Sequence, residues 1–258
     1  MNRINKLFAQ KKQGVFSVYF TAGYPHLNDT VAVITELAAA GADMIEVGIP
    51  FSDPMADGPV IQQSSTAALN NGMSLKKLFA QLQGIREKTQ IPLVMMGYLN
   101  PILQYGIDAF CQSCADAGVD GVIIPDLPFA DYLKDFKPVL DKYALHCTML
   151  ITPETSRERI RLIDEHTSGF IYMVSTASTT GAKDCFDEST VDYFKQVNAM
   201  KLRNPRMIGF GISNKATFQT ACQHAAGAII GSAFVRLLGE QPDVKTAVKK
   251  LLEQIGRN

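Results

Sequence analysis

The feature that most constrains the fold is a regular alternation between short apolar runs and longer segments with helical spacing of apolar residues. Eight short runs recur along the chain, and a helical pattern follows each of them. Eight such units in about 250 residues are typical of a closed (β/α)8 TIM barrel rather than an open parallel sheet. The expected strands are residues 16–21, 43–48, 92–96, 119–124, 146–151, 170–175, 206–210 and 228–230.

The segments between these runs are expected to be helices. Asn28 is the expected N-cap of the first, and Ser74 that of a later one. No linker interrupts the pattern, so residues 1–258 are expected to form a single barrel domain with extra helices. No GxGxxG motif follows the first strand, which disfavours a dinucleotide-binding fold. The expected helices are 27–40, two within 64–88, 108–117, 129–143, 156–166, 188–200, 214–222 and 244–255.

Composition narrows the classes of partner. The chain is 47% hydrophobic and 19% charged with a net charge of zero, which is typical of globular proteins and disfavours nucleic-acid or anionic-membrane binding. The N-terminus lacks an apolar signal core, and no run has the length of a membrane helix. The five cysteines predict reduced thiols in the cytoplasm. The CxxC at 111–114 lacks a second ligand pair, and the four histidines match no metal motif, so no metal is expected.

Glu46 interrupts the second apolar strand. Active sites of such barrels lie at the carboxyl ends of the strands, and Glu46 lies on the strand face that it shares with Met44 and Gly48. An apolar setting would raise its pKa and suit it to both give and take a proton. A structural glutamate that accepts hydrogen bonds from loop amides explains the same position, and this choice stays open from position alone.

Two further carboxylates, Asp53 and Asp57, lie on the loop that follows. Three prolines stiffen this loop, so it is suited to hold a second carboxylate beside Glu46. The alternative is that each aspartate makes a local turn or caps a helix, with Asp57 capping the helix that begins near Pro59.

Glycine-rich segments at 209–213 and 227–233 follow or span the last two strands. Loops at these positions, with a helix N-terminus, form the usual phosphate site of the barrel, and glycine lets the backbone approach an anion. Tight turns alone are the alternative. Thr180 and Gly181 follow the sixth strand and are expected to close over the same site as a lid.

Six segments at these strand ends carry a resemblance to a known family. The chain resembles the tryptophan synthase alpha subunit over nearly its whole length, and the 14-residue segment is the most specific match. The segments are FTAGYP (20–25), EVGIPFSDPMADGP (46–59), MGYLNP (96–101), PDLP (125–128), GFGIS (209–213) and IGSA (230–233).

The resemblance implies a retro-aldol cleavage of indole-3-glycerol phosphate to indole and glyceraldehyde 3-phosphate, without a cofactor in this chain. It implies that Glu46 protonates indole C3 and that Asp57 accepts a hydrogen bond from the indole N–H. It also implies a beta-subunit partner that uses pyridoxal phosphate, in an alpha-beta-beta-alpha complex. One departure is a loop reading STASTTG at 175–181, in which Ser178 and Thr179 replace the family's Gly and Val.

The resemblance assigns further residues to three groups. Those holding the phosphate are Gly181, Gly211, Gly231 and Ser232. Those lining the indole pocket, each of which is equally explained as barrel core, are Tyr19, Met96, Ile123, Tyr172, Phe210 and Ile229. Those facing the beta subunit are Asp53, Pro54, Asn100, Asp126 and Pro128.

Two other functions compete with the lyase. A Schiff-base aldolase on the same barrel needs a desolvated lysine at a strand end, and Lys183 is the only candidate. A phosphate-binding activator that only regulates its partner would need neither carboxylate, so the presence of Glu46 and Asp57 argues against it.

Overall fold

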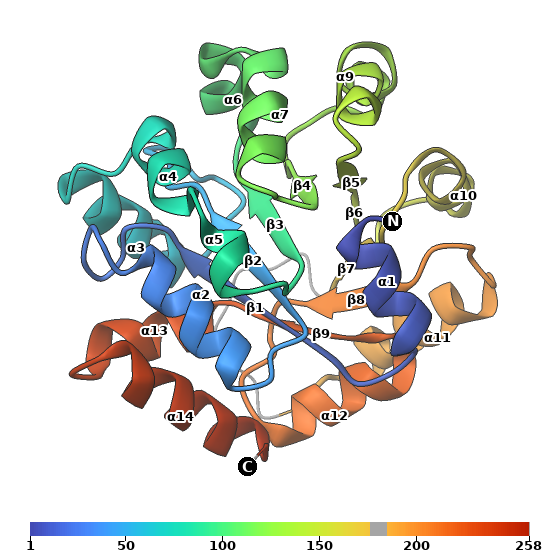
Figure 1. The fold of residues 1–258 in the computed structure, drawn as a ribbon. Helices are drawn as coiled ribbons and strands as arrows, with labels where there is room; N and C mark the ends of the chain where they lie inside the picture. Colours follow the sequence, from blue (N-terminus) through green and yellow to red (C-terminus); the bar gives the residue numbers. More distant parts are fainter. Residues whose placement is uncertain (176–184, 258) are drawn as a thin grey trace.

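A computed structural model describes residues 1–175 and 185–257, and its strands form one parallel sheet in the order β5-β4-β3-β2-β1-β9-β8-β7-β6. Only Met149 separates β5 from β6, and its carbonyl accepts a hydrogen bond from the Tyr172 amide of β7. The two ends of the sheet are therefore one interrupted strand, and the barrel closes as predicted (Figure 1). The strands are β1 (Val15–Thr21), β2 (Met44–Gly48), β3 (Leu93–Met96), β4 (Gly121–Ile123), β5 (His146–Thr148), β6 (Leu150–Ile151), β7 (Ile171–Val174), β8 (Arg206–Gly209) and β9 (Gly227–Ile230).

Helices surround this ring on its outside (Figure 1). All of the expected helices are present, and the 129–143 segment contains a π-helical turn, η1 (Tyr132–Phe136). The helices are α1 (Arg3–Gln10), α2 (Thr30–Ala39), α3 (Pro59–Asn70), α4 (Leu75–Leu82), α5 (Ile85–Lys88), α6 (Leu99–Tyr105), α7 (Ile107–Asp116), α8 (Phe129–Asp131), α9 (Lys137–Lys142), α10 (Arg157–His166), α11 (Glu188–Ala199), α12 (Lys215–His224), α13 (Ser232–Glu240) and α14 (Val244–Ile255). Within the described ranges, none of them has the length and apolar character needed to cross a membrane.

The two predicted caps had different outcomes. Ser74 caps α4 by accepting a hydrogen bond from the Lys77 amide, as expected. The prediction for Asn28 is wrong, because α2 begins one residue later behind Asp29 and has no side-chain cap. The Asn28 side chain instead accepts a hydrogen bond from Gln81 Nε2 at 3.4 Å, so a tertiary contact replaces the local one.

Alternate residues of the strands divide the core into two parts. Odd-numbered positions of β1 and even-numbered positions of β2 point into the barrel, while their neighbours pack under the surrounding helices. The inner cluster includes Met44, Val94, Ile123, Tyr172 and Ile229. The barrel interior is therefore a packed core. A ligand at the mouth would contact the inward-facing residues nearest the carboxyl ends of the strands.

Helix α1, for which the sequence analysis made no prediction, covers the amino-terminal end of the barrel. Its buried residues Ile4 and Phe8 belong to the inner cluster. Buried Asp120 anchors it, since its two carboxylate oxygens pair with Arg3 Nη1 at 3.0 Å and Arg86 Nη2 at 2.8 Å. Active sites of such barrels lie at the carboxyl ends of the strands, which is the end opposite to α1.

Candidate active site at the barrel mouth

Glu46 lies on the inner face of β2, between Tyr19 of β1 and Val94 of β3 in the strand register. Its side chain has no exposed surface. The Ser17 hydroxyl donates a hydrogen bond to Oε1 at 3.3 Å, while Oε2 is buried and has no partner in the described part of the chain. The carboxyl group is thus held inside the barrel with a single hydrogen bond and one free oxygen.

This environment decides between the two interpretations of Glu46. No loop amide in the described chain donates to its carboxyl group, so the structural explanation by loop amides fails. Burial raises the pKa of Glu46 to about 8, and the Ser17 hydrogen bond opposes that shift. The group is therefore mostly protonated at neutral pH and can act as a proton donor.

Asp57 lies on the loop after β2, and its side chain contacts the loop after β3. The Tyr98 hydroxyl donates to Asp57 Oδ2 at 2.9 Å and accepts from the Ala56 amide at 3.0 Å. The N-cap of α3 is Gly58, and no side chain caps this helix, so the capping interpretation of Asp57 is wrong. Burial raises the pKa of Asp57 to about 6, while the hydrogen bond from Tyr98 lowers it.

Two tyrosines lie close to both carboxylates. The pKa values of Tyr19 and Tyr172 are raised because their hydroxyl groups are removed from water and because the negative charges of Asp57 and Glu46 act on both phenols. Their hydroxyl groups lie where a Cβ atom at Gly48 or Gly209 would stand. Glycine at these two strand ends therefore makes room for the rings, and any side chain there would displace them.

The six residues expected to line an indole pocket lie on the inner side of the barrel. Ile123, Tyr172 and Ile229 are buried, and Met96 and Phe210 pack against the same cluster. The rings of Tyr172 and Phe210 meet edge to face with centroids 6.1 Å apart. Tyr19 is half-buried and lies 3.7 Å from the position of a Gly231 Cβ, so it spans the distance between β2 and β9.

The residues expected to bind phosphate and described by the structure follow β8 and β9, on the far side of β1 from β2. Gly231 precedes α13, which begins at Ser232 and has no side-chain cap. Gly211 follows Phe210, and both have positive φ angles, 70° and 66°. The Ser175 hydroxyl donates to the Phe210 carbonyl at 2.8 Å and so holds this turn. Thr180, Gly181, Ser178, Thr179 and Lys183 lie outside the described residues.

The residues expected to face a partner lie on the three adjacent segments that follow β2, β3 and β4, with Asn100 at the start of α6. Asp53, Asn100, Asp126 and Pro128 are exposed, whereas Pro54 is buried. Asp126 Oδ1 accepts a hydrogen bond from the Leu99 amide at 2.8 Å, which joins the second and third segments.

No group of side chains suited to hold a metal ion is present in the part of the chain that the structure describes. Among residues 1–175 and 185–257, no three His, Cys, Asp or Glu side chains are grouped as metal ligands. Cys111 and Cys114 are buried in α7, and burial raises the pKa of both thiols. They are therefore buried core thiols rather than reactive thiolates.

Two side chains that contact the carboxylates were not predicted from the sequence. Tyr98 is the only group that joins the Asp57 side chain to another loop within the described chain, and it stacks on Phe51 with centroids 5.2 Å apart. Ser17 is the hydrogen-bond partner of Glu46. Ser17 could have been predicted, because it is a polar residue at an inward-facing strand position. Nothing in the local sequence relates Tyr98 to Asp57.

We expect replacement of Glu46 by Gln to change how stability depends on pH. Because the folded chain holds the Glu46 proton more tightly than the unfolded chain does, the wild type loses stability as pH rises from about 4.5 to about 8. The free energy of unfolding of Glu46→Gln minus that of wild type should therefore increase across this window, by at most about 1.4 kcal/mol per pH unit. Urea titrations at several pH values measure it, with Glu253→Gln on the surface of α14 as control. A constant or falling difference would contradict the assignment.

Replacement of Tyr98 by Phe should raise the pKa of Asp57 above about 6. The hydroxyl group stabilises the charged carboxylate, and its loss leaves burial unopposed by that hydrogen bond. Carbon-detected NMR of the Asp57 carboxyl group gives the titration. Tyr105→Phe removes a hydroxyl group that contacts Ser113, away from the mouth, and is the matched control. If Tyr98→Phe lowers the Asp57 pKa or leaves it unchanged, the hydrogen bond does not have this role.

Known proteins of one family match this chain over nearly its whole length. A family model described as tryptophan synthase alpha chain matches residues 6–258. The tryptophan synthase alpha chain of Parabacteroides distasonis is 63% identical over 255 residues, which cover 99% of each chain. That of Bacteroides thetaiotaomicron is 60% identical over 255 residues, covering 99% of this chain and 100% of the relative.

Solved structures show the same likeness. The crystal structure of the tryptophan synthase alpha chain from Legionella pneumophila matches with a TM-score of 0.87 and 33% identity, covering 99% of this chain and 96% of that one. A crystal structure of Mycobacterium tuberculosis tryptophan synthase in an aminoacrylate-bound form matches with a TM-score of 0.85 and 30% identity, covering both chains fully. The chain belongs to the tryptophan synthase alpha chain family.

Proposed function

We propose that the chain cleaves indole-3-glycerol phosphate into indole and glyceraldehyde 3-phosphate, with Glu46 and Asp57 as its catalytic residues. The observation that carries the proposal is a pair of carboxyl groups at one mouth whose pKa values differ, about 8 for Glu46 and about 6 for Asp57. At neutral pH one is mostly protonated and the other mostly ionised. Such a pair separates the roles of acid and hydrogen-bond acceptor.

The reaction needs an acid at one carbon and a base at one hydroxyl group. Indole leaves poorly as a carbanion, so its C3 is protonated before the bond to the glycerol carbon breaks. The glycerol hydroxyl next to that bond then loses its proton and becomes the aldehyde. One proton is gained and one is lost, so no redox cofactor enters the balance.

Glu46 is suited to the proton transfers. Its raised pKa supplies a protonated group at neutral pH, and its free Oε2 leaves a hydrogen-bonding position open toward a ligand. After donating to C3, the carboxylate is an anion in an apolar site, which makes it a strong base toward the glycerol hydroxyl.

Asp57 is suited to the indole nitrogen. Protonation of C3 places positive charge on the ring nitrogen, and an ionised carboxylate that accepts the N–H hydrogen bond stabilises that charge. The Tyr98 hydroxyl fixes one Asp57 oxygen and the Ala56 amide fixes Tyr98, so the carboxylate is held in place before the substrate binds.

The remaining groups of the mouth fit the rest of the substrate. The indole ring would lie among Tyr19, Met96, Ile123, Tyr172, Phe210 and Ile229. The backbone at Gly211, Gly231 and Ser232 would hold the phosphate, where the uncapped start of α13 offers amide groups to an anion. Thr180 and Gly181 complete this proposal as a lid and a phosphate contact.

We further propose that this single-domain protein works in the cytoplasm with a beta subunit in an alpha-beta-beta-alpha complex, and that the beta subunit uses pyridoxal phosphate to join indole to serine. Membership of the family supports the partner. Exposed Asp53, Asn100, Asp126 and Pro128, together with Pro54, offer three adjacent segments to it. The Schiff-base aldolase and the non-catalytic activator are not favoured, since the full-length family match points to the lyase.

An assay of indole release, with and without purified beta subunit, tests the proposal. Glu46→Gln and Asp57→Asn should each lower indole release by at least about a hundredfold, because each removes a group needed for proton transfer or charge stabilisation. Addition of the beta subunit should raise release by the wild type and should not restore either variant.

Glu253→Gln serves as the control and should keep wild-type activity. Near-normal turnover by folded Glu46→Gln or Asp57→Asn would refute the assigned roles. A wild-type chain that binds the substrate but never releases indole, even with the beta subunit, would favour the activator instead. A borohydride-trapped adduct on Lys183 would favour the aldolase.

A further inference from the structure

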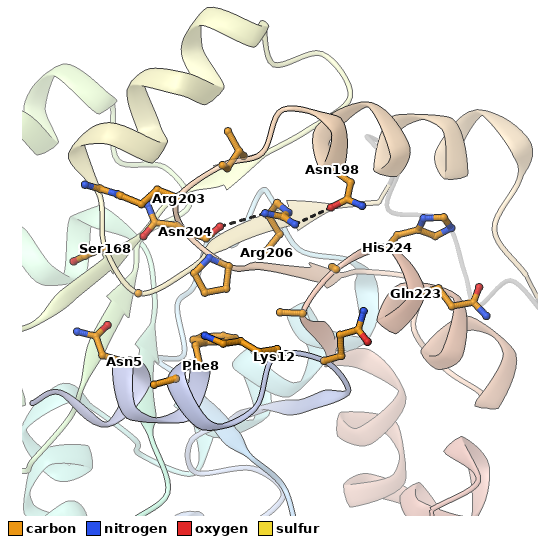
Figure 2. Close-up of a pocket in the computed structure, with 17 residues that line it drawn as sticks. Asn5, Phe8, Lys12, Ser168, Asn198, Arg203, Asn204, Arg206, Gln223 and His224 are labelled. Atoms are coloured by element: carbon orange, nitrogen blue, oxygen red, sulfur yellow. Dashed lines mark hydrogen bonds between the residues drawn. The ribbon is translucent and has the colours of Figure 1, made fainter.

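A cavity opens at the end of the barrel opposite to Glu46 and Asp57. It lies beneath α1, at the amino-terminal ends of β7, β8 and β9, and has a volume of about 640 Å³. Figure 2 shows the α1-side residues Asn5, Phe8 and Lys12 on one wall and Arg203, Arg206 and Asn198 across from them. A cavity of this volume lies within the range of small-molecule sites. The barrel core separates it from Glu46 and Asp57, so it is not part of the mouth.

The charge of this cavity is one-sided. Lys12, Arg203 and Arg206 line it, and no Asp or Glu does. Within the described chain, none of these three cations has a carboxylate partner within 4 Å. Asp164 acts on Arg206 through its charge, but its carboxylate already accepts hydrogen bonds from the Arg203 and Asn204 amides and from Asn204 Nδ2.

Arg206 is held in place by neutral groups. Its Nη2 donates to Asn198 Oδ1 at 2.8 Å, and its Nη1 lies 3.5 Å from the Asn204 carbonyl oxygen. Its Nε is buried and has no acceptor in the described part of the chain. A half-buried guanidinium group without an anionic partner is costly, and burial lowers the pKa of Arg206 accordingly. An anion in the cavity would supply the missing acceptor.

Neutral polar groups surround these cations. The side chains of Asn5, Gln13, Gln223 and His224 line the cavity and have no hydrogen-bond partner in the described chain. Amides and imidazole can donate to and accept from hydroxyl groups. The lining therefore offers cationic side chains to an oxyanion, and neutral polar side chains to the hydroxyl groups of the same ligand.

We propose that this cavity is a binding site for a small phosphorylated sugar or nucleotide. The phosphate would lie between Lys12 and Arg206, because guanidinium and ammonium groups are the usual phosphate ligands. The hydroxyl groups of the sugar would contact the neutral amides on α1 and α12. This site is separate from the proposed phosphate site at the mouth, and the proposal does not depend on the activity proposed there.

Residue-resolved NMR titration of the full chain with ribose 5-phosphate tests the proposal. Shifts of the Gly169, Asn198 and His224 amides report the cavity, and those of Gly211 and Gly231 report the mouth, so the two dissociation constants are fitted separately. The cavity amides should shift saturably with ribose 5-phosphate and at least tenfold more weakly with ribose. Lys12→Glu should weaken cavity binding at least tenfold, since it reverses a charge at the phosphate. Arg206→Gln should do the same if it folds.

Lys6→Glu is the matched control, since it makes the same charge change on an exposed residue of α1 outside the cavity lining. It should weaken cavity binding less than twofold. Equal losses from Lys6→Glu and Lys12→Glu would mean a general charge effect and overturn the proposal. Shifts confined to Gly211 and Gly231, or no saturable shift, would overturn the cavity as a site. Succinate binding as tightly as ribose 5-phosphate would overturn the phosphate assignment.

Discussion

The carboxyl group of Glu46 in the barrel interior is the interaction on which the rest of the site depends. An ionised carboxylate with one weak hydrogen bond and no cation would be unstable there, so the group keeps its proton at neutral pH. That state follows directly from the fold. The strand register places Glu46 level with Tyr19 and Val94, and inside the closed barrel its side chain has no exposed surface.

The segments that follow β2, β3 and β4 are connected by hydrogen bonds near Asp57. Asp57 is bonded to Tyr98, and the next residue, Leu99, donates its amide to Asp126. The mouth and the exposed loops after β3 and β4 are therefore joined through two consecutive residues.

The sequence predicted the barrel because its eight strands and most of its helices are set by local periodicity, which survives without knowledge of tertiary contacts. It also predicted that Glu46 lies on the inner face of a strand, with Asp57 on the loop that follows, because strand parity and the barrel rule restrict where polar side chains can meet; the register confirms the position of Glu46, and the catalytic roles of the two residues stay a prediction. The features that the sequence did not predict depend on contacts between distant parts of the chain. Asn28 bonds to Gln81 from another helix, α1 is held by Asp120 far along the chain, and Tyr98 reaches Asp57 across two loops. The cavity under α1 combines residues from four distant segments, so no local pattern could indicate it.

The protonation state of Glu46 is the central claim, and a direct titration of its carboxyl group tests it best. Carbon-detected NMR of chain labelled at the glutamate carboxyl carbons, with the Glu46 signal assigned by comparison with Glu46→Gln, follows this one group with pH. Glu46 should still be mostly protonated at pH 7 and should lose its proton near pH 8. A Glu46 signal that is already fully ionised at pH 6 would contradict it.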